Sequence, residues 1–216
     1  MLRLSLGDEA ALLAYVGRQL EHFFPDGRSA QPPLLQAALR PALQRLQRVI
    51  NAVRWWPVDE FDHLHSSQYT TFLYCLAREL WLGSHDRPLC NKLFGLNKAL
   101  NGIDLFYEIE MPEVFFIGHS VGIVLAKAAY GNRLVLYQGC TVGKNHGAAP
   151  VLGEGVVMYP GSAIIGRCEI GAGSVIGQGV SVVNRSTPGQ CLVFQGSAAN
   201  LCFKPTVRDA LGDIFR

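Results

Sequence analysis

Aliphatic residues recur at every sixth position through the second half of the chain. A helix repeats about every 3.6 residues and a strand about every 2, so neither gives this period. A coiling β-solenoid does, because each flat face of the coil uses the same number of residues. The aliphatic series is Leu152, Met158, Ile164, Ile170, Ile176 and Val182. Small or medium-sized residues follow at the expected corners: Val156, Ser162, Cys168, Ser174 and Val180. The pattern predicts a solenoid with the aliphatic series inside.

The same count extends upstream with one slip and one interruption. It begins at Ile117 and Ile123, slips by one residue and resumes at Tyr130. Ten positions rather than six separate Val142 from Leu152, so residues 143–150 must leave the solenoid as a loop. Loops on a rigid scaffold are common places for binding residues. The other upstream positions are Leu136 inside and Val121, Leu134 and Cys140 at corners.

The first half of the chain shows the spacing of amphipathic helices. Asp8 can cap a helix that runs to about Phe24, and Pro32 opens a second that runs to about Val53. Pro41 lies inside the second pattern, which predicts a kink or two shorter helices. Two further helices are expected, from Ser66 or Ser67 to about Leu82 and from Asp86 to Gly102.

These patterns predict an α+β chain in three parts. The parts are an α-helical domain over 1–104, a β-helix of hexapeptide repeats over 105–190 with an ejected loop at 143–150, and a C-terminal tail over 191–216. The tail holds a strand-like run from Cys191 to Phe194 and a final helix from about Val207. A solenoid end needs a cap, and this tail is the natural candidate.

The composition is that of an ordinary globular protein and indicates no particular binding partner. Hydrophobic residues make up 49% and charged residues 17%, and the formal net charge is +2. This balance gives no basic bias toward nucleic acid, and no apolar run is long enough to span a membrane. Asp8 and Glu9 lie too early for a signal peptide. The six cysteines form no CxxC pair, which favours reduced thiols and a cytoplasmic protein.

Two histidines of the solenoid are candidates for chemistry. His119 occupies the third place of its hexad and is expected to point outward, and His146 lies in the ejected loop near Lys144. An inert, solvated histidine remains the alternative for each. The run from Gly118 to Gly122 also matches the GxSxG pattern of α/β-hydrolases. No helix is expected after it, so we do not assign Ser120 as a nucleophile.

Taken together, the helical first half, the hexad solenoid and the histidine loop resemble the serine acetyltransferases. Residues 118–124 resemble the segment around that family's catalytic histidine, and His146 falls where the family has a second active-site histidine. The resemblance implies a left-handed parallel β-helix and direct acetyl transfer from acetyl-CoA to a small hydroxyl compound. It also implies a site between the subunits of a homotrimer, with a dimer of trimers through the helical domain as a further option. No metal is expected.

The resemblance also implies roles for individual residues. His119 would be the general base, His146 a second catalytic residue, and Glu110 the carboxylate that orients His119. Glu108 is the alternative to Glu110 in this role. Both glutamates fall in residues 107–110, which read as an extended segment with both carboxylates on one face. Acetyl-CoA would bind near the coil edge and the tail, at Gly143, Pro160, Gly161, Gln178, Gly196 and Lys204.

Three positions depart from the family pattern. Gly118 replaces an aspartate that helps to hold the amino group of serine, and Lys127 replaces a glutamate. The chain ends in Arg216 rather than the isoleucine that docks into a sulfhydrylase partner. L-Serine is therefore the first acceptor to consider, and a sugar or another small hydroxyl compound is the alternative. A zinc hydratase would need three histidine ligands where the solenoid offers two. A non-catalytic trimeric scaffold is the remaining reading.

Overall fold

The computed structural model describes residues 2–28, 31–197, 200–206 and 209–216. These residues form two compact units, which we describe separately. The helical unit comprises Met1–Asn51 and Trp56–Glu108, and the β-helix unit comprises Ala52–Trp55 and Ile109–Arg216. This division falls after Glu108 and keeps the tail with the β-helix, whereas the sequence suggested boundaries after residues 104 and 190. The suggested limits stay predictions.

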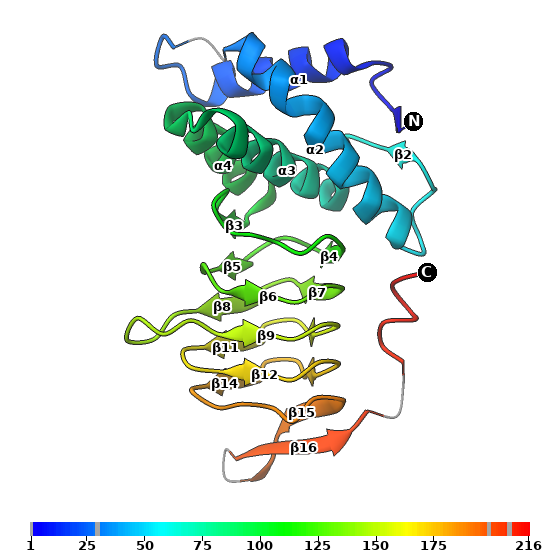
Figure 1. The fold of residues 1–216 in the computed structure, drawn as a ribbon, viewed down its shortest axis with the longest axis vertical. Helices are drawn as coiled ribbons and strands as arrows, with labels where there is room; N and C mark the ends of the chain where they lie inside the picture. Colours follow the sequence, from blue (N-terminus) through cyan, green and yellow to red (C-terminus); the bar gives the residue numbers. More distant parts are fainter. Residues whose placement is uncertain (1, 29–30, 198–199, 207–208) are drawn as a thin grey trace. The chain divides into compact units, whose positions relative to one another are not determined.

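The helical unit follows the predicted helices closely (Figure 1). Asp8 caps the first helix, since its Oδ1 accepts a hydrogen bond of 2.8 Å from the Ala11 backbone N–H. Gly102 ends the last helix in a left-handed conformation, at φ 63°. The helices are α1 (Glu9–Phe23), α2 (Pro32–Ala52), α3 (Ser66–Ser84) and α4 (Arg87–Asn101). Short strands β1 (Arg3–Leu4), β2 (Glu60–Phe61) and β3 (Asp104–Leu105) complete the unit. Among the described residues, no helix is long and apolar enough to cross a membrane.

The second and third helices each differ from the prediction in one respect. α2 is one helix with Pro41 inside it, so the option of two shorter helices is wrong. Its buried residues, among them Leu39, Ala42 and Leu46, keep one stripe in the core on both sides of the exposed proline. α3 continues through Gly83 to Ser84, because the left-handed residue that ends it is His85, at φ 54°.

The β-helix unit is a stack of short parallel strands in three sheets (Figure 1). The first sheet has the order β15-β13-β10-β7-β4, with β16 added antiparallel to β15; the second contains β14-β11-β8-β5; the third is β12-β9-β6. First-sheet strands are β4 (Phe115–Gly118), β7 (Leu134–Tyr137), β10 (Val157–Met158), β13 (Val175–Ile176), β15 (Cys191–Gln195) and β16 (Leu201–Pro205). Second-sheet strands are β5 (Val124–Leu125), β8 (Thr141–Gly143), β11 (Ala163–Ile165) and β14 (Ser181–Val183). Third-sheet strands are β6 (Ala129–Tyr130), β9 (Val151–Leu152) and β12 (Glu169–Ile170).

Strand register confirms the predicted inward series. Met158 pairs with Leu136 on one side and Ile176 on the other, so that equivalent positions of successive coils stack. Ile164 lies in the same way between Val142 and Val182 in the second sheet. All six aliphatic residues from Leu152 to Val182 are at most 2% exposed. The predicted corner residues Val156, Ser162, Cys168, Ser174 and Val180 are buried as well. The core is therefore a column of aliphatic side chains closed by small corners.

The first coil departs from the predicted count. Leu125, not Ile123, pairs with Val142, and it is buried. Val121, predicted at a corner, is 68% exposed, and the side chain buried at this turn is Ile123. Tyr130, a predicted inward position, pairs with Leu152 but is only half-buried. The corner assignment of Val121 is therefore wrong, because this coil is longer than the others between its first and second strands.

The tail covers the β-helix without the predicted final helix. Residues 209–216 form turns, in which Asp209 Oδ1 accepts hydrogen bonds from the backbone N–H groups of Leu211 and Gly212. Val207 itself lies outside the described residues. Ile214 and Phe215 are each 3% exposed and lie against the segment 52–55, where Val53 bridges to Phe215. Burial against the β-helix, rather than helix propensity, organises these residues.

This tail explains why one outer face of the β-helix is apolar. In β4, β7, β10 and β13 the outward residues Phe116, Val135, Val157 and Val175 are at most 7% exposed, whereas Leu192, which pairs with Val175 in β15, is 37% exposed. A leucine of the tail, Leu211, lies close enough that a Cβ on Gly155 would approach its Cδ1 to 2.7 Å. In the second sheet, by contrast, outward Val124 and Val183 are 45% and 43% exposed. The tail therefore occupies one face and leaves another uncovered.

Candidate functional site

His119 lies in a local insertion at the corner between the first and second sheets. Ile117 pairs with Leu136 and Leu125 with Val142, so eight positions separate the first-coil pair where six separate the next. A Cβ on Gly122 would lie 3.4 Å from the Cα of Gly139, so these two glycines stack at the turn. The two surplus residues therefore come before Gly122, in the stretch that holds His119.

The backbone of this insertion presents His119 outward. Its φ of 58° is left-handed, a region that non-glycine residues rarely occupy and that often marks a functional position. The side chain is exposed, while the neighbouring Ser120 is 4% exposed. The outward position predicted for His119 is thus confirmed. The short strand β5 follows, not a helix, so the setting of a nucleophile elbow is absent here.

His146 lies at the tip of the predicted loop. The loop leaves after β8 and returns at β9, and it projects from the β-helix in Figure 1. Asn145 and Ala148 exchange backbone hydrogen bonds of 3.0 Å across its tip. Between them, His146 and Gly147 both have positive φ, 47° and 80°, as in the tight turns of β-hairpins. The loop thus holds His146 on a short ribbon, exposed to solvent.

The two histidines occupy different corners of the β-helix. His119 lies between the first and second sheets, and His146 lies between the second and third. Within the described residues, no hydrogen bond joins them, and no group of three or more His, Cys, Asp or Glu side chains could hold a metal ion. The two side chains thus leave the β-helix at separate corners.

The two candidate glutamates fall in different units. Residues 107–109 form a turn and a bend, so the predicted extended segment is wrong. Glu108 belongs to the helical unit, where Arg78 donates a hydrogen bond of 3.3 Å to its carbonyl. Glu110 begins the β-helix unit and is exposed between buried Ile109 and Met111. In the described residues, no hydrogen bond joins Glu110 to His119.

The residues expected to bind acetyl-CoA form three groups. Gly161 donates a backbone hydrogen bond of 2.9 Å to Gln138, and Gly179 donates one of 3.0 Å to Pro160. These bonds stack Pro160, Gly161 and Gln178 on the corner that carries His119. Gly143 ends β8, at the start of the His146 loop. Gly196 and Lys204 lie on the hairpin of β15 and β16, where Lys204 Nζ lies 5.1 Å from the centre of the Phe194 ring.

Gly118 has a structural reason that the sequence did not disclose. A Cβ at this position would lie 2.9 Å from the Phe116 ring and 3.1 Å from the Tyr137 ring. Tyr137 in turn stacks on Tyr159 of the next coil. An aspartate beside His119 would therefore require these rings to shift. The sequence carries a signal for it, because Tyr137 and Tyr159 occupy equivalent places once the residues of the ejected loop are discounted.

Several known proteins resemble this chain in sequence or in structure. No family model matches the chain. A serine acetyltransferase of Synechococcus elongatus is 31% identical over 145 residues, which are 63% of this chain and 57% of the relative. One of Mycobacterium tuberculosis is 29% identical over 126 residues, 55% of this chain and 53% of the relative. The chain thus spans little more than half the length of these curated relatives.

Solved structures establish the fold. A serine acetyltransferase of Neisseria gonorrhoeae superposes with a TM-score of 0.73 at 21% identity, over 95% of this chain and 81% of that one. The enzyme of Brucella abortus gives a TM-score of 0.68 at 20% identity, over 90% and 83%. The fold is therefore the predicted one, helices followed by a left-handed parallel β-helix of hexapeptide repeats.

Proposed function

We propose that this chain, a serine acetyltransferase-like hexapeptide-repeat protein, transfers acetyl from acetyl-CoA to a hydroxyl group of a small acceptor, with L-serine as the first candidate. The observation that carries the proposal is His119, held outward in a left-handed conformation by an insertion in the first coil. Pro160, Gly161 and Gln178 stack below it on the same corner and offer an edge for acetyl-CoA. The curated relatives support the same reaction, since each of those described above is a serine acetyltransferase.

In this mechanism, His119 is the general base. Its imidazole accepts the proton of the acceptor hydroxyl while the oxygen attacks the thioester carbonyl. The tetrahedral intermediate then collapses, the C–S bond breaks, and the imidazolium returns the proton to the CoA thiolate. Glu110 would orient the ring and stabilise the imidazolium, and Glu108 is the alternative carboxylate for this role. A backbone N–H of the corner, or His146, would donate a hydrogen bond to the oxyanion.

The separation of the two histidines supports an assembly with a site between subunits. Because His119 and His146 lie on different corners, a homotrimer can bring the His119 corner of one subunit to the His146 loop of the next. The outer face of the second sheet is the face available for this contact, with Val124 and Val183 exposed. We propose this homotrimer, a pairing of trimers through the helical unit, and a cytoplasmic setting without nucleic acid or membrane.

The glycine at position 118 supports a second class of acceptor as the alternative to serine. A carboxylate beside His119 would suit the amino group of serine, and here aromatic rings fill that space. A sugar or another small hydroxyl compound carries no ammonium group and does not need this carboxylate. The acceptor is therefore the part of the proposal that an experiment must settle first.

Thiol release from acetyl-CoA tests the reaction and the acceptor together. We expect the purified protein to release CoA thiol with L-serine, and we would assay sugars and amino alcohols in parallel. Turnover with a sugar and not with serine would move the protein to the second acceptor class. Release that no acceptor increases would contradict acetyl transfer altogether and favour the scaffold.

Replacing His146 with glycine should lower acetyl transfer without changing the fold. If this side chain donates a hydrogen bond to the oxyanion, its loss is expected to reduce kcat by about 10² to 10³. The loop tip should keep its shape, because glycine adopts the positive φ of this position, 47°, without strain, and the Asn145 and Ala148 backbone bonds do not involve the imidazole. Steady-state kinetics check the prediction, and a kcat within twofold of the parent enzyme would exclude a catalytic His146.

A further inference from the structure

One pocket of the β-helix unit lies where the tail crosses the first sheet. Its volume is 390 Å³, within the range of about 300 to 1,000 Å³ that small-molecule sites occupy. Three separate segments of the chain supply its walls. They contribute Trp55; Tyr137 and Tyr159; and Ala210, Asp213 and Ile214. None of these residues has a role in the acetyl transfer proposed above.

Two tyrosine rings form one wall of this pocket. Tyr137 and Tyr159 follow paired residues of β7 and β10, so their rings lie on successive coils, with centroids 5.6 Å apart and planes 7° apart. The column is two rings high, because the equivalent positions above and below are Gly118 and Gly177. Tyr159 remains 37% exposed, so its ring is accessible to a ligand.

Trp55 is held beside these rings by the backbone of the tail. Arg54 donates a backbone hydrogen bond of 2.8 Å to Ile214, and Arg216 donates one of 2.9 Å to Ala52. The Trp55 ring meets the Phe116 ring edge-on at 5.7 Å and is 56% exposed. These backbone hydrogen bonds between residues 52–54 and 214–216 also fix the part of the tail that contains Asp213. Trp55 and Asp213 are therefore placed by the same contacts, whereas the two tyrosines are placed by the coils of the β-helix.

Asp213 contributes a carboxylate to the lining of the pocket. Burial raises the pKa of Tyr137 above its ordinary value, and the neighbouring Tyr159 and Asp213 raise it further. The carboxylate therefore lies near the Tyr137 side chain. Ring faces carry negative potential and attract cations, and a nearby carboxylate adds to that attraction. Aromatic rings with an acid are how proteins recognise alkylated ammonium groups.

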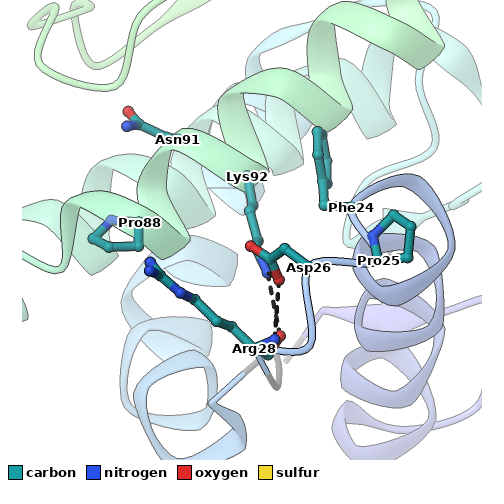
Figure 2. Close-up of a pocket in the computed structure, with 7 residues that line it drawn as sticks. All are labelled: Phe24, Pro25, Asp26, Arg28, Pro88, Asn91 and Lys92. Carbon is teal, nitrogen blue, oxygen red and sulfur yellow. Dashed lines mark hydrogen bonds and ion pairs between the residues drawn. The ribbon is translucent and has the colours of Figure 1, made fainter.

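We propose that the pocket of Trp55, Tyr137, Tyr159 and Asp213 binds a small organic cation with an alkylated ammonium head. The rings would contact the alkyl groups and the carboxylate would face the charge. One pocket of the helical unit, lined by Asp26, Arg28 and Lys92 among others, does not offer this chemistry (Figure 2). That cavity of 430 Å³ contains Lys92, whose Nζ donates to Asp26 at 2.7 Å and to the Arg28 carbonyl at 3.2 Å.

Choline is the probe, and its neutral analogue, in which tert-butyl replaces trimethylammonium, is the control of equal shape. The full-length protein would be titrated with each by calorimetry at constant ionic strength, without acetyl-CoA. We expect saturable choline binding and an affinity for the neutral analogue lower by about tenfold. Because no acetyl donor is present, failure here is independent of failure in acetyl transfer. Equal affinities, or no saturable choline binding, would overturn the proposal.

Substitutions then assign the binding to this pocket. Tyr159→Leu and Asp213→Asn should each weaken choline binding by about threefold to tenfold, and Tyr159→Phe should preserve it because the ring face remains. Phe203→Leu, an exposed aromatic of β16 outside the pocket, is the matched control. Thermal unfolding would verify that each variant is folded. Choline affinity that all four variants leave unchanged would place the site elsewhere and refute the assignment.

Discussion

Replacing His119 with asparagine is expected to reduce acetyl transfer by about 10² to 10⁴ in kcat, the range that a general base contributes. Asparagine suits the test because it adopts left-handed backbone conformations more readily than other side chains. The φ of 58° at this corner can therefore be kept while the imidazole is removed. The variant should melt at the temperature of the parent protein and lose thiol release with every acceptor. Alanine at the same site would add backbone strain to the loss of the base.

His85→Asn provides the control for this result. His85 is also exposed and also left-handed, at φ 54°, but it ends helix α3 in the helical unit. Its replacement should leave kcat unchanged. If the two asparagine variants lost activity to the same degree, the effect of His119→Asn would reflect general destabilisation. If neither lost activity, His119 would not be the base.

Sequence reasoning succeeded where one physical requirement repeats along the chain. The inward positions from Leu152 to Val182 had to be aliphatic in every coil, because each side chain packs on its copies in the neighbouring coils. The loop with His146 was found for the same reason, because ten positions separate Val142 from Leu152 where the repeat needs six. Helix limits with a dedicated cap, such as Asp8 and Gly102, were also readable, because caps act locally.

The remainder depended on contacts between residues far apart in sequence. In the six-residue count, Ile123 could be taken as an inward residue. The pairing of Leu125 with Val142 shows instead that the insertion lies around His119. The tail contains no repeat from which its structure could be predicted. Its conformation is set by contacts with Val53 and with the apolar outer face of the first sheet. The aromatic column was concealed because the ejected loop changes the spacing between Tyr137 and Tyr159. Long-range packing, not local propensity, decided all three.

Replacing Ile164 with alanine is expected to destabilise the β-helix by about 2 to 5 kcal/mol, the usual cost of truncating a fully buried aliphatic side chain. Ile164 is 0% exposed and lies between Val142 and Val182 in the middle of the second sheet. Its loss would leave a cavity lined by both neighbouring coils, which rigid strands cannot close. Urea unfolding followed by circular dichroism would measure the change in the free energy of unfolding.

The adjacent isoleucine gives the control, because the strand alternates its side chains between core and exterior. Ile165→Ala removes the same atoms from the outer face, where the side chain is only partly buried, and should cost less than about 1 kcal/mol. Equal losses for the two variants would mean that the inward and outward positions of β11 are not those of the aliphatic series. A larger loss at Ile165 that grows with protein concentration would instead show that this outer face is buried between subunits, as the proposed trimer requires.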